Sequence, residues 1–278
     1  MRVLVTGGAS GLGAAMVARF AARGDDVVVA DLPHALAALE GQGDPSGEAP
    51  GRLHPLPLDV TSDADWAAAR AWVHERWGGL DVLVNNAGVA TGGRIDVVGL
   101  EEWQRVIDVN LLGVVRGCRT FAGDLKAQGS GHIVNTASLA GLVHPPGMAS
   151  YTAVKAGVVA LSESLAYELH PFGVQVTALC PGFIRTPLSG SLTGSDTAMD
   201  AVAARLIDSS PYTADQVADA LLAGMAAGDL VVLPDPAAEA AVRSKHEDRA
   251  AYDAEQRRFA ARIAQLEVGQ DASGKDEG

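Results

Sequence analysis

The sequence predicts an α/β protein, with a doubly wound parallel sheet of about seven strands, helices on both faces of the sheet and a helical extension at the C-terminus. Two observations predict this class. Short apolar segments alternate with longer segments of helical spacing from the first residues to about residue 235. The apolar segments are hydrophobic along their whole length, which is typical of parallel strands that are covered on both sides.

The predicted strands are rich in Val, Leu and Ile, and several are followed at once by Gly, Asn, Asp or Ser. They are 2–6, 27–30, 53–58, 81–84, 131–137, 174–179 and 230–233. The helices predicted from apolar residues that recur on one side are 12–23, 66–77, 100–122 and 151–170. The segment 41–51 is rich in Gly and Pro and predicts a surface loop.

The chain divides into one large domain and a tail. Residues 1–235 carry all the predicted strands and are expected to form one domain, in which about 186–211 makes a mobile lid with a short amphipathic helix. Residues 236–278 are rich in Ala and mixed charges and predict a helical extension that packs on the body or on a second subunit, with a frayed end beyond about 269. Its apolar face would carry Tyr252, Phe259, Ile263 and Leu266.

Composition excludes several classes of protein. The 21 basic and 34 acidic residues give a net charge of −13, which argues against nucleic-acid binding and against an anionic membrane surface. The 2 cysteines, Cys118 and Cys180, have no paired spacing, so we expect buried thiols and neither a disulfide nor a metal site. Because the first strand starts almost at the first residue, no leader is expected and the predicted location is the cytoplasm.

A glycine-rich turn follows the first predicted strand. Thr6-Gly7-Gly8-Ala9-Ser10-Gly11-Leu12-Gly13 lies between a strand and a helix, the context in which backbone N–H groups approach a pyrophosphate at the helix N-terminus. A plain strand–helix turn is the alternative, although it needs fewer glycines. The turn therefore predicts a Rossmann-type dinucleotide site at the carboxyl end of the first strand.

Asp31 closes the second predicted strand, 18 residues beyond Gly13. A carboxylate there can accept hydrogen bonds from both hydroxyls of an adenosine ribose and would repel a 2′-phosphate. No Arg or Lys occurs in the glycine turn or in 32–39, so the pattern favours NAD over NADP. The alternative is that Asp31 only caps the following loop.

Further motifs follow in order at the strand ends. Asp59-Val60 follows the third strand, Asn85-Asn86-Ala87-Gly88 the fourth and Pro181-Gly182 the sixth. Together with the glycine turn and the set Asn110, Ser138, Tyr151 and Lys155, they resemble the short-chain dehydrogenases/reductases, in their single-domain NAD-dependent type. The resemblance covers about 2–234 and implies oxidation and reduction of alcohols and ketones with a nicotinamide cofactor. The contacts that it and the glycine turn imply for the cofactor involve Gly7, Ser10, Gly11, Leu12, Gly13, Asp31, Leu32, Asp59, Val60, Asn86, Ala87, Gly88, Tyr151, Lys155, Pro181, Gly182, Ile184 and Thr186.

The spacing of Tyr151 and Lys155 suits acid–base chemistry. They lie one helical turn apart, so a cation would stand near the phenol and is expected to lower its pKa. Ser138 ends the fifth strand and could polarise the substrate oxygen in the same crevice. The resemblance implies that Lys155 also binds the cofactor ribose and that Asn110 holds a water in a proton relay. As isolated residues, each of these also has an ordinary structural interpretation.

The substrate side is less defined. The segments 139–150 and 186–211 are expected to form the pocket, and their few basic residues favour a neutral or moderately apolar alcohol or ketone. His144 either contacts the substrate or faces solvent. A 3-ketoacyl-carrier reductase and a non-catalytic NAD-binding regulator are the alternative functions. The resemblance further implies a homodimer or homotetramer that pairs helices 100–122 and 151–170.

Overall fold

The computed structural model describes residues 1–40, 52–186 and 194–273, and the predicted loop 41–51 lies outside them. All strand pairs are parallel, in the order β3-β2-β1-β4-β5-β6-β7. The strands are β1 Arg2–Thr6, β2 Asp26–Asp31, β3 Leu53–Pro57, β4 Val82–Asn85, β5 Gly131–Thr136, β6 Val174–Leu179 and β7 Val231–Val232. The predicted fold class is therefore confirmed, with each strand within a few residues of its expected place.

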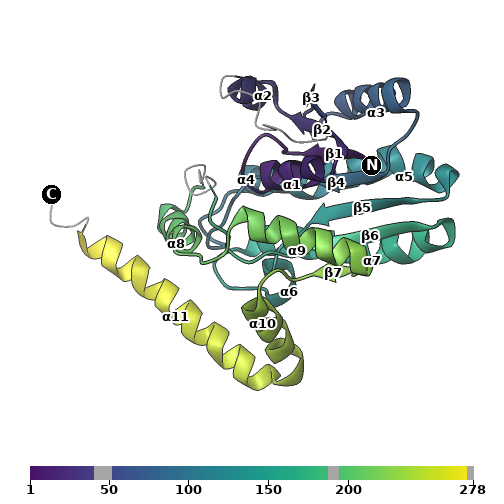
Figure 1. Ribbon diagram of the computed structural model, residues 1–278. Helices are drawn as coiled ribbons and strands as arrows, with labels where there is room; N and C mark the ends of the chain where they lie inside the picture. The colour runs from purple at the N-terminus through teal and green to yellow at the C-terminus, as the bar shows by residue number, and fades with distance from the viewer. Residues whose placement is uncertain (41–51, 187–193, 274–278) are drawn as a thin grey trace.

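The order of the strands reverses between β1 and β4. The chain runs outward from β1 to β3 and then returns to β4 beside β1, so the loops at the carboxyl ends of these two strands diverge. In doubly wound sheets ligands bind in the crevice at this reversal. The topology thus places the glycine turn after β1 next to the loop after β4 (Figure 1).

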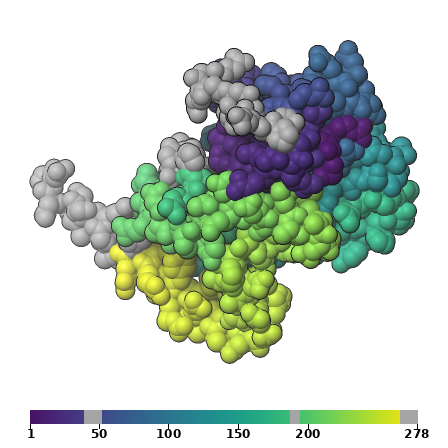
Figure 2. Space-filling view, in the orientation of Figure 1, coloured from purple at the N-terminus to yellow at the C-terminus, as the bar shows by residue number. Residues whose placement is uncertain are grey.

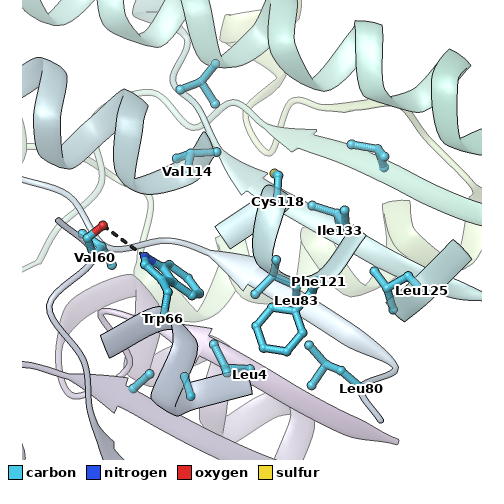
Figure 3. Packing of buried hydrophobic residues seen from close by; sticks show 14 of the residues in the cluster. Leu4, Val60, Trp66, Leu80, Leu83, Val114, Cys118, Phe121, Leu125 and Ile133 are labelled. Atoms are coloured by element: carbon cyan, nitrogen blue, oxygen red, sulfur yellow. Dashed lines mark hydrogen bonds between the residues drawn. The ribbon is translucent and has the colours of Figure 1, made fainter. Parts of the chain in front are cut away.

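Three helices cover one face of the sheet: α3 Asp63–Trp77, α5 Gly113–Gln128 and α7 Ala149–Leu169. The core under them is drawn in Figure 3, where Trp66, Phe121 and Leu4 pack together and the Trp66 indole N–H donates to the Val60 carbonyl at 3.1 Å. Both cysteines are free and buried in this cluster, as expected.

The other face is covered by α1 Gly11–Ala22, α2 Pro33–Glu40 and α9 Ala214–Ala227. We did not predict α2 or α9. The start of α9 has a local signal, because Thr213 and Gln216 form a capping box and Gly228 ends the helix with φ of 78°. Its apolar residues contact α1 across the face.

The predicted helix 100–122 is three segments. The α-helix α4 Leu100–Ile107 passes into a π-helical turn, η1 Asp108–Leu112, and then into α5, which continues to Gln128. A π-turn inserts a residue into the helical repeat, and a 3.6-residue pattern alone does not reveal it. The turn places Asn110 in the interior, with 0% exposure.

Two helices follow β7. Asp235 caps α10 Pro236–Glu247, and α11 Arg249–Ser273 runs back toward α8 Thr197–Asp208 (Figures 1 and 2). Of the expected apolar face, Tyr252 and Ile263 are buried and Phe259 is half-buried, while the side chain of Leu266 lies outside the described part. The helix is continuous to Ser273, past the predicted start of fraying. Among the described residues, no helix is long and apolar enough to cross a membrane.

Candidate active site

Two glycines of the turn after β1 allow close packing of the backbone. Gly7 has φ of 62°, and a Cβ there would lie 2.8 Å from the Ala87 Cα. A Cβ on Gly13 would lie 1.9 Å from the Gly7 carbonyl oxygen. Neither position has room for a side chain, so these glycines fix the turn against the loop after β4.

Gly11 is different, because an added Cβ there would make only ordinary van der Waals contact. Its φ is 52°, and the nearest atom to an added Cβ is the Thr186 Cβ at 3.8 Å. Ser10 is exposed and its side chain makes no capping hydrogen bond to α1 in the described part of the chain. A glycine turn with accessible backbone at a helix N-terminus suits a phosphate group, so the residues present fit a dinucleotide.

Asp31 lies beside this turn at the end of β2. Its Oδ2 accepts from the Ala9 N–H at 3.0 Å and its Oδ1 from the Leu32 N–H at 2.8 Å. The bond from the Leu32 N–H is the loop cap that was considered as the alternative role of Asp31. The bond from the Ala9 N–H joins the carboxylate to the glycine turn. The carboxylate remains half-exposed at the point where an adenosine ribose would bind.

Asp59 and Val60, which follow β3, both contact other residues of the protein through their side chains. Asp59 Oδ1 accepts from both the N–H and the hydroxyl of Thr61, at 2.8 and 2.7 Å. Val60 is 8% exposed and packs against Gly113, where an added Cβ would approach to 3.0 Å. The Val60 side chain therefore belongs to the core, and the structure leaves only the backbone and Asp59 near the surface of the loop.

Asn86 joins the strands at the reversal point. Its side-chain N–H donates to the Thr6 carbonyl at 3.0 Å, and its Oδ1 accepts from the Thr136 hydroxyl at 3.3 Å. The Thr6 hydroxyl accepts in turn from the N–H groups of Asn86 and Ala87. Asn86 thus braces the sheet through its side chain. These roles of Thr6 and Thr136 were not predicted, because the sequence shows only a threonine at the end of each strand.

Asn110 holds the loop after β4. Its Oδ1 accepts from the Val89 N–H at 2.8 Å, and its side-chain N–H donates to the Val89 carbonyl at 2.9 Å. Gly88 lies against it, since an added Cβ would be 3.1 Å from Oδ1. The side chain is therefore engaged in supporting the loop, and its predicted part in a proton relay remains a prediction.

Ser138, Tyr151 and Lys155 come together at the carboxyl end of β5. Ser138 lies close enough to Tyr151 to favour its phenolate, and the Lys155 ammonium lies 5.7 Å from the centroid of the Tyr151 ring. The Lys155 Nζ donates to the Thr136 carbonyl at 2.7 Å. The helix α7 supplies the tyrosine and the lysine, and β5 the serine, as the spacing predicted.

Burial controls the proton affinities of this cluster. It lowers the pKa of Lys155 to about 8, because the ammonium loses its hydration. It also raises the pKa of Tyr151, and the nearby Ser138 offsets only part of that rise. The pKa of Tyr151 is therefore raised, opposite to the expected lowering, because desolvation of the phenolate is the largest effect on it.

The loop after β6 approaches both halves of the site. Pro181 is buried, and its carbonyl accepts from the Leu139 N–H at 2.8 Å and from the Ser138 hydroxyl at 3.4 Å. Gly182 lies beside Leu139, Ile184 packs on the core under α1, and Thr186 faces Gly11. The predicted motif residues of this loop thus link Ser138 to the glycine turn.

The helix α8 lies in the segment 186–211 that is expected to form a lid, of which 187–193 lie outside the described residues; the helix is amphipathic as predicted, with Met199 and Ile207 buried. Its N-cap Asp196 is fully buried and accepts from the Arg94 backbone N–H at 2.9 Å and from the Arg94 Nε at 2.7 Å. Although burial opposes it, this pairing lowers the pKa of Asp196. This ion pair was not predicted from the sequence, because the two residues are 102 positions apart.

The switch-point crevice, the glycine turn and the Ser–Tyr–Lys cluster define a dinucleotide-dependent oxidoreductase. The comparisons agree: the family described as "short chain dehydrogenase" matches residues 1–196, and the chain belongs to it. A 3-alpha-(or 20-beta)-hydroxysteroid dehydrogenase of Mycobacterium bovis is 40% identical over 187 residues, which are 67% of this chain and 70% of that protein.

Solved structures of the family share the fold. A short-chain dehydrogenase/reductase from Burkholderia phymatum in complex with NAD superposes with a TM-score of 0.79 at 32% identity, covering 89% of this chain and 93% of that one. One from Sphingobium yanoikuyae in complex with NADPH has a TM-score of 0.71 at 30% identity, covering 95% of each chain. Similar folds thus hold either dinucleotide, and the choice depends on local residues.

Proposed function

We propose that this protein is an NAD-dependent oxidoreductase that interconverts a secondary alcohol and a ketone. The observation that carries the proposal is the grouping of Ser138, Tyr151 and the buried Lys155 at the carboxyl end of β5, with the Lys155 ammonium 5.7 Å from the Tyr151 ring. NAD, when bound, supplies the nicotinamide carbon that accepts or returns the hydride of the substrate carbon.

Each protein group has one part in the reaction. Ser138 donates a hydrogen bond to the substrate oxygen and so stabilises charge that develops on it. In oxidation, the Tyr151 phenolate oxygen takes the alcohol proton; in reduction, the phenol returns it to the same oxygen. Lys155, with a pKa of about 8, exchanges a proton near neutral pH and offers its ammonium to the cofactor ribose. Asn110 supports the proton relay by holding the loop after β4.

Asp31 supports NAD as the cofactor. Its carboxylate is fixed at the glycine turn, and 32–39 contains no Arg or Lys that could neutralise a 2′-phosphate. The other contacts that we propose are the backbone of Gly11, Leu12 and Thr186, and the loop 86–88. The substrate is proposed to be neutral or moderately apolar, and the steroid dehydrogenase relative acts on a ligand of that kind.

The test is turnover by the purified chain. We expect reduced cofactor to form, followed by its absorbance, when NAD⁺ is mixed with a panel of secondary alcohols that includes hydroxysteroids, and much less to form with NADP⁺. Tyr151→Phe should abolish it, whereas Tyr167→Phe, an exposed tyrosine of the same helix, should not. NAD binding without turnover of any alcohol or ketone would favour a regulator, and preferred reduction of carrier-bound ketoacyl groups with NADPH would favour the ketoacyl reductase.

We also propose a homodimer or homotetramer in the cytoplasm. Leu100 and Tyr167, on α4 and α7, are 86% and 72% exposed in the single chain, as expected for helices that pair between subunits. Sedimentation of the wild-type chain should give the mass of two or four copies. A chain that sediments as a monomer at all concentrations would contradict this.

A further inference from the structure

The C-terminal helices bind the loop that joins Ser138 to Tyr151. From α10, the Lys245 ammonium donates to the Leu142 carbonyl and lies 2.9 Å from His144 Nδ1. From α11, the buried Tyr252 hydroxyl donates to the Val143 carbonyl. Figure 1 shows α10 directly beneath the short helix α6 Ala140–Val143. We call α10 and α11 together the C-terminal clamp.

The C-terminal clamp contacts the end of α6, where the carbonyl groups of the helix lack hydrogen-bond donors within the helix. The last carbonyls of a helix have no intrahelical donors, and a cation near them is favourable. Lys245 and Tyr252 satisfy two consecutive carbonyls of this kind. The next residue, His144, has φ of 55° and is the one non-glycine residue with positive φ in the described part of the chain. Such a conformation is costly and persists where neighbouring contacts hold it.

The other end of α6 touches the catalytic residues. The Ser138 hydroxyl accepts from the Ala140 N–H at 3.1 Å. Gly141 packs on α7 so closely that an added Cβ would lie 2.6 Å from the carbonyl carbon and oxygen of Lys155. A shift of α6 therefore cannot occur without moving Ser138, the backbone of Lys155 or both.

A third contact lies further along the loop. At Gly147, with φ of 78°, an added Cβ would lie 2.7 Å from Met199 Cε on the lid helix and 3.1 Å from Ile263 Cδ1 on α11. The Gly147 carbonyl accepts from the Gly93 N–H at 2.7 Å. The clamp, the lid and the loop after β4 thus meet just before α7 begins, close to Tyr151.

We infer that the C-terminal clamp sets the shape of the substrate pocket, with Lys245 and Tyr252 as positioning residues for the loop 139–148. The inference rests on the proposed function, because that loop is assigned there to the substrate. His144 is accordingly a partner of the clamp, and its imidazole braces the loop.

Kinetics of three variants test the inference. Lys245→Met, Tyr252→Phe and the double variant each remove hydrogen bonds that hold the loop. We expect the KM for the alcohol to rise about fivefold in each single variant and more in the double variant, from the usual value of a hydrogen bond. The KM for NAD should not change, and Lys245→Arg should restore most of the loss. A merely structural defect would reduce the active fraction and lower kcat with both KM values unchanged.

The matched control is Asp253→Asn. Asp253 follows Tyr252 on α11, and its partner is Arg249 of the same helix, at 2.7 Å. It should leave the KM for the alcohol at the wild-type value. An unchanged KM in the double variant would overturn the inference.

Amide hydrogen exchange provides a readout that does not need turnover. In Tyr252→Phe, which removes a single oxygen atom, exchange at 141–148 should become about fivefold faster, while β4 and α5 stay as in the wild type. If no variant and no wild type turns over an alcohol, the proposed function fails and this measurement still tests the clamp. Wild-type exchange rates at 141–148 in Tyr252→Phe would refute the clamp even in an active enzyme.

Discussion

The two halves of the site at the carboxyl edge of the sheet are held in different ways. The proposed cofactor half, which comprises 6–13, Asp31 and 86–88, is fixed by glycines that admit no Cβ and by hydrogen bonds that Asp31 and Asn86, at the ends of the strands, make to the backbone of the glycine turn and of Thr6. The substrate half, which comprises 93–98, 138–151 and 196–208, is held by side chains from outside the sheet, such as Arg94 on Asp196 and Tyr252 on Val143. The cofactor half is therefore a property of the sheet itself, whereas the substrate half depends on the lid and the tail.

This difference has a consequence for change within the family. A replacement in the lid or the tail can reshape the substrate half without touching the glycine turn, because no described contact of the clamp reaches 6–13. A replacement in the glycine turn is tolerated less well, because the backbone of the turn packs directly against the loop after β4. The substrate half is the region in which specificity can vary at low cost to the fold.

The largest expected effect on activity is at Tyr151, which lies where the cofactor half and the substrate half meet. Tyr151→Phe should lower kcat/KM about a thousandfold, as loss of a general acid–base group typically does, and should lower cofactor affinity far less, because the other proposed cofactor contacts remain. Steady-state kinetics and cofactor titration check this. Retention of full activity would contradict the assignment of Tyr151.

The second effect concerns the lid anchor of the substrate half. Arg94→Met leaves the fully buried Asp196 carboxylate without its cation, which should lower the free energy of unfolding by about 3 kcal/mol. Arg52→Met, which breaks an exposed pair with Asp26, is the control and should leave the denaturation midpoint unchanged. Urea denaturation of both variants tests this prediction. Equal denaturation midpoints for the two variants would mean that the Arg94–Asp196 pair contributes nothing to stability.

The third prediction concerns the pH dependence of stability, which we expect to depend on a buried histidine in the strands beneath the substrate half. Burial lowers the pKa of His132 on β5 to about 4, and the ring bonds the Thr177 hydroxyl at 2.9 Å. The unfolded chain then binds a proton near pH 6.5 and the native chain only near 4, so stability is full above 6.5 and falls as the pH drops between these values, by roughly 3 kcal/mol. Denaturant titrations from pH 7 to 4 measure the slope, and His132→Gln should flatten it. An equal slope in that variant would assign the acid sensitivity to other groups.

The fourth prediction concerns the cofactor half. Gly13→Ala would bring a methyl group within 1.9 Å of the Gly7 carbonyl oxygen, so it should destabilise the protein by about 2 kcal/mol and weaken cofactor binding. Gly123→Ala on α5, where an added Cβ meets nothing within 4 Å, should be neutral or slightly stabilising. Thermal melts with and without NAD compare the two; normal binding by Gly13→Ala would show that the turn can move.

The smallest effect concerns cofactor choice. Asp31→Asn removes the charge that repels a 2′-phosphate, so the preference for NAD over NADP should fall about tenfold, or about 1.4 kcal/mol. Ratios of kcat/KM with the two cofactors measure it. An unchanged ratio would mean that Asp31 acts only as the cap of the glycine turn and the Leu32 N–H.

The sequence by itself determined the fold class, the strand order along the chain and the grouping of Ser138, Tyr151 and Lys155. The fold class follows from local periodicity, and the place of Ser138 from the rule that parallel strands end at one edge; its grouping with Tyr151 and Lys155 was implied by the resemblance to the short-chain dehydrogenases/reductases. Local sequence also contained the capping box of α9, although we did not predict that helix. The glycine turn was recognisable because its glycines are needed for backbone contact, which any sequence with this fold must satisfy.

The tertiary structure alone decided the rest. The π-turn that buries Asn110, the core position of Val60 and the rise in the pKa of Tyr151 all depend on how tightly neighbouring elements pack. The lid anchor and the C-terminal clamp join residues more than a hundred positions apart, as in Arg94 with Asp196 and Lys245 with Leu142. Periodicity indicates which side of a helix is buried, but it does not indicate which other element covers that side. The substrate half is built from contacts between such distant elements.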